Sequence, residues 1–219
     1  MQTRSTEDYL KNIYRLQQED EKATTSSLAN VLKISSASVS EMVSKLSKSG
    51  WIKNKPYHGF QLTSKGEKEA LALVRKHRLL ETFLQHNLNY SWGEVHDEAE
   101  CLEHVVSDKF IKKLDEYLGF PKFDPHGDPI PNSKGIIHDA KRIQLVQSNV
   151  GTHYIISKVN DDSNDILFYL AGLGIKLNTK IQICDKLSFD GSVIIKFSNK
   201  KQTLSKKIAE HIFVVKSKS

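Results

Sequence analysis

The stretch EVHDEAECLEHVVSD, residues 94–108, concentrates acidic and histidine side chains. No lysine or arginine occurs from Leu79 to Asp108, although the 219-residue chain has a formal net charge of +6. The spacing predicts a helix that starts after Ser91 and ends near Asp108. At about 100° per residue, one arc of this helix gathers two acids and two histidines. They are His96, Glu100, Glu103 and His104.

Two interpretations of this acidic face are open. Carboxylates held this close repel one another unless a cation lies between them. Manganese, iron, zinc and nickel all accept mixed carboxylate and imidazole ligands. A solvated acidic face with incidental histidines is an equally good explanation of this helix taken alone. Another side of the helix is expected to be apolar, with Ala99, Leu102, Val105 and Val106. Cys101 points about 100° away from Glu100 and is expected in the core.

The composition predicts a globular protein with a packed core. Hydrophobic residues make up 38% of the chain and charged residues 26%, which argues against disorder. The sequence pI of about 9.1 hints weakly at a polyanionic partner. Two distant cysteines, Cys101 and Cys184, do not form a disulfide framework. A polar N-terminus without a signal-peptide core, and no apolar run of about 18 residues, favour a soluble cytoplasmic protein without membrane contact.

Residues 6–63 have the pattern of a winged helix-turn-helix. Helices are expected over residues 6–19, 24–32 and 35–49, followed by strands at 51–57 and 59–63. The first turns of the third helix are small and hydroxylic, which suits close approach to DNA. From Ala37 to Lys65 five basic residues accompany one acid. The residues expected to contact DNA are Ser35, Ser36, Ser38, Ser40, Lys45, Lys48 and Lys55.

The remaining chain predicts a helical region, a tether and a β domain. A long helix over 65–88 carries His77 and Glu81 at i and i+4, within reach of one ion. Four of the five prolines lie in the irregular stretch after residue 118, where Asp124 and His126 are candidate ligands. Short strands after residue 143 suggest a small β-barrel. The expected segments are residues 1–64, 65–120, 121–143 and 144–219.

Four motifs, taken in order, resemble the diphtheria-toxin-repressor family of metal-dependent transcriptional repressors. They are TEDYLKNIY (6–14), RKHRLLE (75–81), VHDEAECLEH (95–104) and PHG (125–127). The likeness is greatest to its manganese-responsive branch with a C-terminal domain. It implies a mainly α chain: a winged helix-turn-helix, a helical dimerisation and metal-binding domain, and a C-terminal SH3-like β-barrel akin to the ferrous-transport protein domain. It also implies no enzymatic activity, and a homodimer that binds palindromic operators of metal-uptake genes when metal is bound.

The resemblance also implies the metal ligands. One site would use Asp8, His77, Glu100, Glu103 and His104. A second would use Glu81 and His126, joined by Asp124 and Asp161, with His96 in that site or supporting it. Iron-responsive members place Met and Cys where this chain has Asp8 and Glu100, so the harder ligands here favour Mn²⁺, with Fe²⁺ as the alternative.

This sequence departs from the pattern of the family that it resembles at two positions. Lys11 stands where the small manganese regulators have a Glu, which argues against their closely spaced pair of metals. Asp124 stands where streptococcal manganese regulators have a Cys, so the second site would contain only oxygen and nitrogen ligands. Three other functions stay open: a winged-helix regulator of a small organic ligand, a transcriptional activator that does not need manganese, and a less favoured metal-dependent phosphoesterase.

Overall fold

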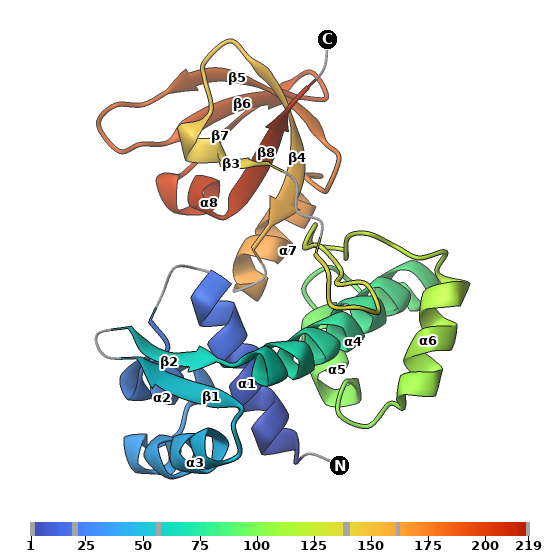
Figure 1. Cartoon of the computed structure of the whole chain (residues 1–219). Coiled ribbons are helices and arrows are strands. Elements are labelled where there is room, and N and C mark those ends of the chain that lie inside the picture. The colour runs from blue at the N-terminus through green and yellow to red at the C-terminus, as the bar shows by residue number, and fades with distance from the viewer. Residues whose placement is uncertain (1–2, 19–21, 56–57, 138–140, 161–162, 218–219) are drawn as a thin grey trace. The chain divides into compact units, whose positions relative to one another are not determined.

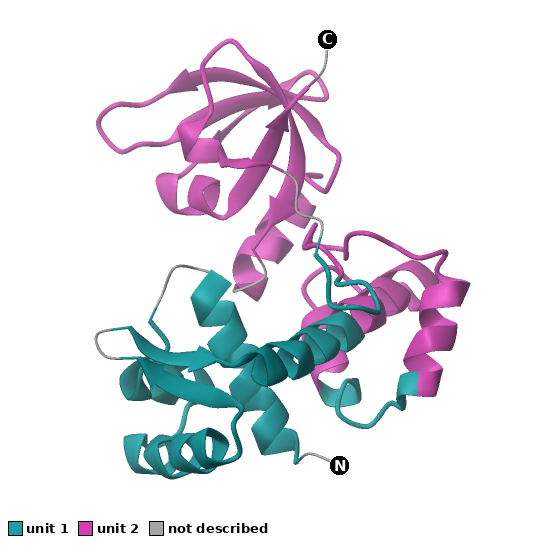
Figure 2. Cartoon of the chain, in the orientation of Figure 1, with its two compact units in different colours: residues 1–77, 101–108, 131–137 teal, residues 78–100, 109–130, 138–219 magenta. Residues whose placement is uncertain are grey.

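The computed structural model describes residues 3–18, 22–55, 58–137, 141–160 and 163–217 (Figure 1). Residues 56–57, at the end of the first expected wing strand, and the predicted ligand Asp161 lie outside these ranges. The chain forms two compact units (Figure 2). Unit 1 comprises residues 1–77, 101–108 and 131–137, and unit 2 comprises residues 78–100, 109–130 and 138–219.

Unit 1 has the element order of a winged helix-turn-helix. Its elements are α1 (Arg4–Gln18), α2 (Thr25–Leu32), α3 (Ser36–Lys48), β1 (Ile52–Lys55), β2 (Gly59–Leu62) and the first half of α4 (Ser64–Leu88). The two strands pair antiparallel, with Ile52 opposite Leu62 and Lys55 opposite Gly59. This arrangement confirms the fold predicted for the N-terminal region.

Capping residues set the ends of the two helices of the helix-turn-helix. The Thr24 hydroxyl accepts from the Ser27 backbone N–H at 3.1 Å, and the Ser27 hydroxyl accepts from the Thr24 N–H at 2.8 Å. This reciprocal pair is a capping box, which satisfies two N–H groups that the helix itself leaves unpaired. Lys33 ends α2 in the left-handed conformation, and Ser35 caps α3 through the Ser38 N–H. The short turn between α2 and α3 is therefore fixed by local chemistry.

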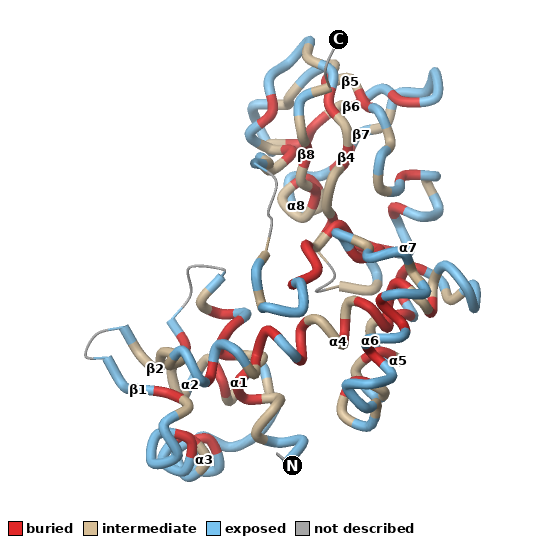
Figure 3. The backbone as a smooth tube through the Cα atoms, turned by 45° about the vertical axis from the view of Figure 1, so that its right-hand side comes forward, coloured by how far each residue is buried: buried red, intermediate tan, exposed pale blue. Residues whose placement is uncertain are grey.

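One core holds unit 1 together. Side chains of α1 such as Leu10 and Ile13 are buried against the helix-turn-helix and the start of α4. Figure 3 shows buried backbone recurring along α1 and α4. Gly66 lets α4 start close to the hairpin, because a Cβ there would lie 2.1 Å from the Trp51 carbonyl oxygen. The core therefore fixes α1, and with it Asp8, relative to α3.

Unit 2 combines helices with the C-terminal β domain. Its helical part is the second half of α4, most of α5 (Val95–Leu102) and most of α6 (Asp108–Tyr117). The irregular segment that follows forms a tight turn closed by a bridge between Phe123 and Pro129. Backbone N–H groups of Asp124 and Gly127 bond within this turn, to the Asp128 and Asp124 carbonyls at 2.9 Å and 3.1 Å.

The described part of the C-terminal domain contains one antiparallel sheet in the order β3-β8-β4-β5-β6-β7. The strands are β3 (Ile143–Gln144), β4 (His153–Val159), β5 (Lys180–Lys186), β6 (Val193–Phe197), β7 (Lys200–Leu204) and β8 (Ile212–Lys216). Short helices η1 (Leu145–Gln147), α7 (Asn164–Gly172) and α8 (Lys206–Glu210) accompany them. Alternate strand residues are buried, as expected for a small barrel-like sheet with one apolar face.

The tether packs directly on β4. The Val159 N–H donates to the His126 carbonyl at 2.9 Å, and the Lys158 ammonium donates to Asp128 at 2.7 Å. At Gly127 a Cβ would lie 2.1 Å from the Ser157 carbonyl oxygen, so only glycine fits this approach. The backbone of the predicted ligand His126 is therefore fixed by a strand of the C-terminal domain.

Three expectations about the acidic helix were wrong, and one strand was not predicted. The acidic helix ends at Leu102 and does not continue to Asp108, so Glu103 and His104 lie in the turn after it. The expected apolar stripe therefore breaks, and Val105 is 75% exposed. Cys101, expected in the core, is exposed. In the C-terminal region β7 was not predicted, because its sequence KKQTL lacks apolar alternation.

Among the helices that the structure describes, none combines the length and apolarity needed to cross a membrane.

Candidate metal centres

The first candidate centre lies in unit 1, between α1 and the turn after α5. His104 Nε2 lies 3.0 Å from Asp8 Oδ1 and 3.4 Å from Glu103 Oε1. One ligand atom from each residue falls within a group whose members are all within 4.8 Å of one another. The Glu103 side chain is 0% exposed, and that of His104 is 4% exposed. Two carboxylates and an imidazole thus converge where water has little access.

The hydrogen bonds of His104 leave one ring nitrogen for a ligand role. Its Nδ1 lies 2.7 Å from Glu7 Oε2, and because a carboxylate only accepts, Nδ1 carries the proton and donates. Nε2 is buried and has no hydrogen-bond partner among the described residues. A carboxylate behind one imidazole nitrogen, with the other nitrogen directed at the ion, is the usual arrangement of a metal-binding histidine. The Glu7 contact was missed at the sequence level, where Asp8 alone was singled out.

His77 and Lys11 complete the polar groups around Glu103. His77 Nδ1 lies 2.6 Å from Glu103 Oε2. The Lys11 ammonium donates to both Glu103 oxygens at 2.9 Å and lies 3.2 Å from His77 Nδ1. The structure therefore brings the predicted ligands His77, Asp8, Glu103 and His104 together within unit 1. Glu100 belongs to unit 2, and its place among these ligands stays a prediction.

The second candidate centre lies in unit 2. Glu81 on α4 is 1% exposed, and its Oε1 lies 3.4 Å from His96 Nδ1 and 3.9 Å from His126 Nε2. His126 is fully buried, and within the described part of the chain neither of its ring nitrogens has a hydrogen-bond partner. A buried imidazole without hydrogen bonds is costly unless another ligand satisfies it. The donor set of Glu81, His96 and His126 fits a divalent transition metal.

The ring of Trp92, which was not predicted from the sequence to belong to a site, stacks on His126. Trp92 stacks on the imidazole, with ring centroids 5.8 Å apart and an interplanar angle of 6°. The indole Nε1–H donates to the Pro125 carbonyl at 2.9 Å. Nothing in the spacing of Trp92 marks it, because it precedes the acidic helix and lies 33 residues before its partner Pro125.

Asp124 is used differently from its neighbour His126. Its Oδ1 accepts from the backbone N–H groups of His126 and Asp128, both at 2.9 Å. Its Oδ2 lies 3.5 Å from Arg78 Nε. Burial, followed by the nearby carboxylates of Asp128 and Glu81, raises the pKa of Asp124 well above its usual range. In this geometry Asp124 closes the turn that presents His126, and its role as a ligand stays a prediction.

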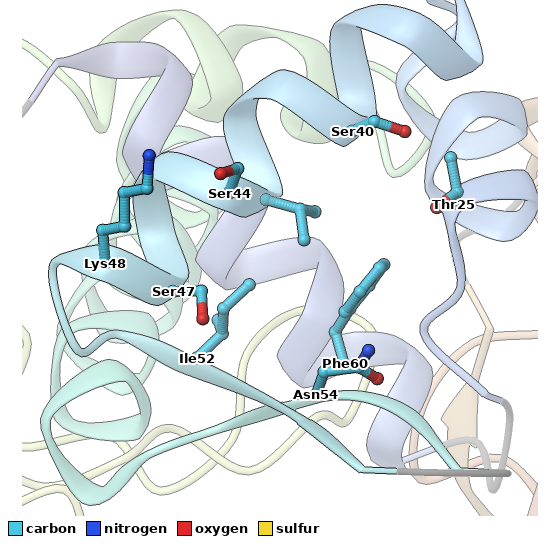
Figure 4. Close-up of a pocket in the computed structure, with 9 residues that line it drawn as sticks. Thr25, Ser40, Ser44, Ser47, Lys48, Ile52, Asn54 and Phe60 are labelled. Atoms are coloured by element: carbon cyan, nitrogen blue, oxygen red, sulfur yellow. The ribbon is translucent and has the colours of Figure 1, made fainter.

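The predicted DNA-contacting residues lie together on unit 1. All seven are exposed: Ser35, Ser36, Ser38, Ser40, Lys45, Lys48 and Lys55. A pocket of about 400 Å³ opens between α3, the start of α2 and the hairpin. Figure 4 shows Ser40, Ser44 and Ser47 reaching it from α3, with Asn54 and Phe60 on the hairpin side. Ser44 and Ser47 were not among the residues predicted to contact DNA, although their spacing from Ser40 puts them on the same helix face.

Known families match the chain in three consecutive parts. Residues 1–60 match the N-terminal DNA-binding domain of iron-dependent repressors, and residues 63–132 match their metal-binding and dimerisation domain. Residues 143–216 match the FeoA domain. These matches confirm the predicted fold class, with an N-terminal DNA-binding domain, a helical domain and a C-terminal β domain.

Individual relatives and solved structures agree with the family matches. The iron-dependent repressor IdeR of Mycobacterium leprae is 31% identical over 204 residues, which cover 87% of each chain. The structure also superposes on a manganese-dependent transcriptional repressor in complex with manganese, with a TM-score of 0.91 and 37% identity. That match covers 97% of this chain and 100% of the other. For ScaR with bound Zn²⁺ the TM-score is 0.83 at 34% identity, over 97% and 99% of the two chains.

These relatives are transcriptional repressors and not enzymes, as predicted. Their names divide between iron and manganese, so the comparisons support a divalent metal site without choosing the metal. The chain belongs to the iron-dependent repressor family, also called the diphtheria-toxin-repressor family, whose metal-dependent repressors join a DNA-binding domain to a metal-binding and dimerisation domain.

Proposed function

We propose that this chain is a manganese-responsive homodimeric repressor that binds palindromic operators of metal-uptake genes when its metal is bound. The observation that carries the proposal is the donor set of the first centre. Asp8 and Glu103 offer carboxylate oxygens beside His104 Nε2, and Glu100 is proposed to add a third carboxylate. No sulfur belongs to this set. Hard oxygen ligands favour Mn²⁺ over softer competitors, with Fe²⁺ as the second choice.

The first centre links the metal to DNA through α1. Asp8 directly precedes Tyr9 and Leu10, two buried side chains that pack α1 into the core of unit 1. Glu103 and His104 come from a segment far along the chain. An ion held by all three residues favours the arrangement in which α1 is docked on that segment, and so shifts the population of DNA-binding states. A coupling of about 1–3 kcal/mol is enough to change operator affinity 5- to 150-fold.

We assign the second centre to Glu81, His96 and His126, with Asp124 holding the turn. Asp161, which lies outside the described residues, is proposed as a further oxygen ligand. Because the His126 carbonyl is bound by the Val159 N–H, this centre would connect the ligands of the helical region to the C-terminal domain. Its proposed role is to stabilise the dimerisation and FeoA regions as one unit.

The deciding experiment measures operator binding with and without metal. Fluorescence anisotropy of a labelled palindrome from a manganese-transporter promoter would be recorded for chelated protein and with Mn²⁺, Fe²⁺ or Zn²⁺. We expect tight binding only with metal, strongest with Mn²⁺, and its loss in Glu103→Ala. Asp97→Asn, which removes an exposed acid from α5, is the matched control and should bind like the wild type.

Equal affinity in chelated and metal-loaded protein would contradict the proposal and favour a regulator of an organic ligand. A response to Fe²⁺ at concentrations where Mn²⁺ has none would keep the mechanism and change the metal.

A further inference from the structure

Lys11 occupies an unusual position for a surface-type side chain. Its ammonium donates to both oxygens of Glu103 at 2.9 Å and lies 3.2 Å from His77 Nδ1. The Lys11 side chain is only 16% exposed, and its partner Glu103 is 0% exposed. The Lys11 ammonium therefore lies among the ligands proposed for the first centre.

We infer that Lys11 is an internal competitor of the metal, which raises the concentration of metal needed to load the first centre. This inference rests on the proposed function of Asp8, Glu103 and His104 as ligands. A divalent ion that binds Glu103 must either replace an ammonium contact or lie beside the ammonium, because Lys11 already donates to both carboxylate oxygens. The charge of Lys11 also repels a second cation placed a few ångströms away.

Lys11 lies on the same helix as the proposed ligand Asp8. Asp8 and Lys11 are three residues apart, so they lie on the same face of the helix. Asp8 attracts the metal ion, whereas Lys11 neutralises Glu103, which the ion needs as a ligand. With Lys11 on Glu103, the buried carboxylate has a counterion before any metal arrives, so the metal gains less by binding.

A purely structural ion pair makes a different prediction. Removing one partner of a buried pair leaves an uncompensated charge, which destabilises the protein. If Lys11 only supports the fold, its loss lowers stability in every state and leaves metal affinity unchanged or weaker. If Lys11 competes with the metal, its loss lowers the stability of the chelated protein but raises metal affinity, because the ion then neutralises the free Glu103 carboxylate.

The test is isothermal titration of Mn²⁺ into full-length Lys11→Met protein. A Glu81→Gln background removes the proposed second centre, so that the heat reports the first centre alone. We expect Lys11→Met to bind Mn²⁺ at least about 10-fold more tightly, since hydrogen bonds to a charged group are of that strength. The melting temperature of the chelated protein should fall, and excess Mn²⁺ should restore most of the loss.

Two further variants identify the cause. Lys11→Arg keeps the positive charge and should bind Mn²⁺ like its parent. Lys206→Met removes an exposed lysine that faces Glu210 at 3.8 Å in the C-terminal domain, and it should change neither affinity nor melting. If chelated Lys11→Met does not fold, Lys11→Gln, which retains a hydrogen-bond donor, provides the same comparison.

Unchanged or weaker Mn²⁺ binding in Lys11→Met overturns the inference. Asp8→Asn separates this result from failure of the proposed function. If Asp8→Asn abolishes binding and Lys11→Met does not tighten it, only the competitor role of Lys11 is wrong. If Asp8→Asn binds Mn²⁺ like its parent, the proposed ligands are wrong and the inference falls with them.

Discussion

Neighbouring side chains set the surroundings of the ligands proposed for both candidate centres. His104 is directed by Glu7, and Glu103 is neutralised by Lys11. His126 has no hydrogen bond to its ring among the described residues and is oriented by the flat face of Trp92 instead. Glu7 and Lys11 lie as close to their partners as the proposed ligands of the first centre lie to one another. None of them follows from the ligand pattern in the sequence, because each contact depends on tertiary packing.

Trp92 should strengthen metal binding at the second centre. An aromatic face attracts positive charge, so it favours an imidazole that has bound a metal over a neutral one. We expect Trp92→Leu to weaken Mn²⁺ binding there roughly 3- to 30-fold, and Trp92→Phe, which keeps an aromatic face, to weaken it less. Titration calorimetry in an Asp8→Asn background would measure the second centre alone. Equal losses in the Leu and Phe variants would mean that Trp92 acts only through its volume or its bond to Pro125.

At the scale of elements, helices were predicted better than the turns and strands around them. The helices over residues 4–18, 25–32, 36–48 and 64–88 follow apolar periodicity and capping residues, and their ends match within two residues. The acidic helix was predicted to be too long because the period of its sequence continues after the regular helix ends at Leu102. Even so, Glu103 and His104 were correctly predicted to lie near each other, since neighbouring residues in a turn stay close. β7 was missed because its lysines hide the alternation that marks β6.

The capping box of α2 should contribute measurably to stability. Thr24 both accepts from the Ser27 N–H and offers its own N–H to the Ser27 hydroxyl. Thr24→Ala removes the acceptor and should lower the free energy of unfolding by about 1 kcal/mol. Ser26→Ala, at an exposed neighbouring position, should have little effect. Urea unfolding followed by far-UV circular dichroism makes the comparison, and an equal loss in both variants would rule out a specific cap.

At the scale of the whole molecule, family membership explains why a basic winged helix and an acid-rich centre occur in one chain. Cations are placed where DNA phosphates are expected, and carboxylates are placed where a metal is expected. Composition alone gave only weak hints of either partner, since the net charge of +6 averages over both surfaces. The family resemblance supplied the domain order and the ligand sets. It did not supply the ion pair of Lys11 or the turn made by Asp124, because these contacts follow from tertiary packing.

Lysines of α3 should make operator binding depend strongly on salt. Each phosphate neutralised by a lysine steepens the plot of log affinity against log salt by about 0.9. Lys48→Gln in both subunits of a dimer should therefore make that slope shallower by about 1.8. It should also lower the affinity for all DNA sequences by the same factor. Lys206→Gln, in the C-terminal domain, is the control and should leave the slope unchanged. A Lys48→Gln variant with an unchanged slope would place this lysine away from the DNA backbone.

The neighbouring positions His126 and Gly127 have a consequence for how the tether can vary in length. One residue presents its ring to Glu81, and the next passes so close to β4 that a side chain is excluded. Adding or deleting one residue in the turn would move other residues into these two positions. The His126 ring would then turn away from Glu81, or a residue with a Cβ would take the place of Gly127 beside β4. Length changes here would silence the second centre while both flanking domains stay folded. The turn therefore acts as a spacer of fixed length between two domains, and it should tolerate fewer insertions and deletions than its irregular backbone suggests.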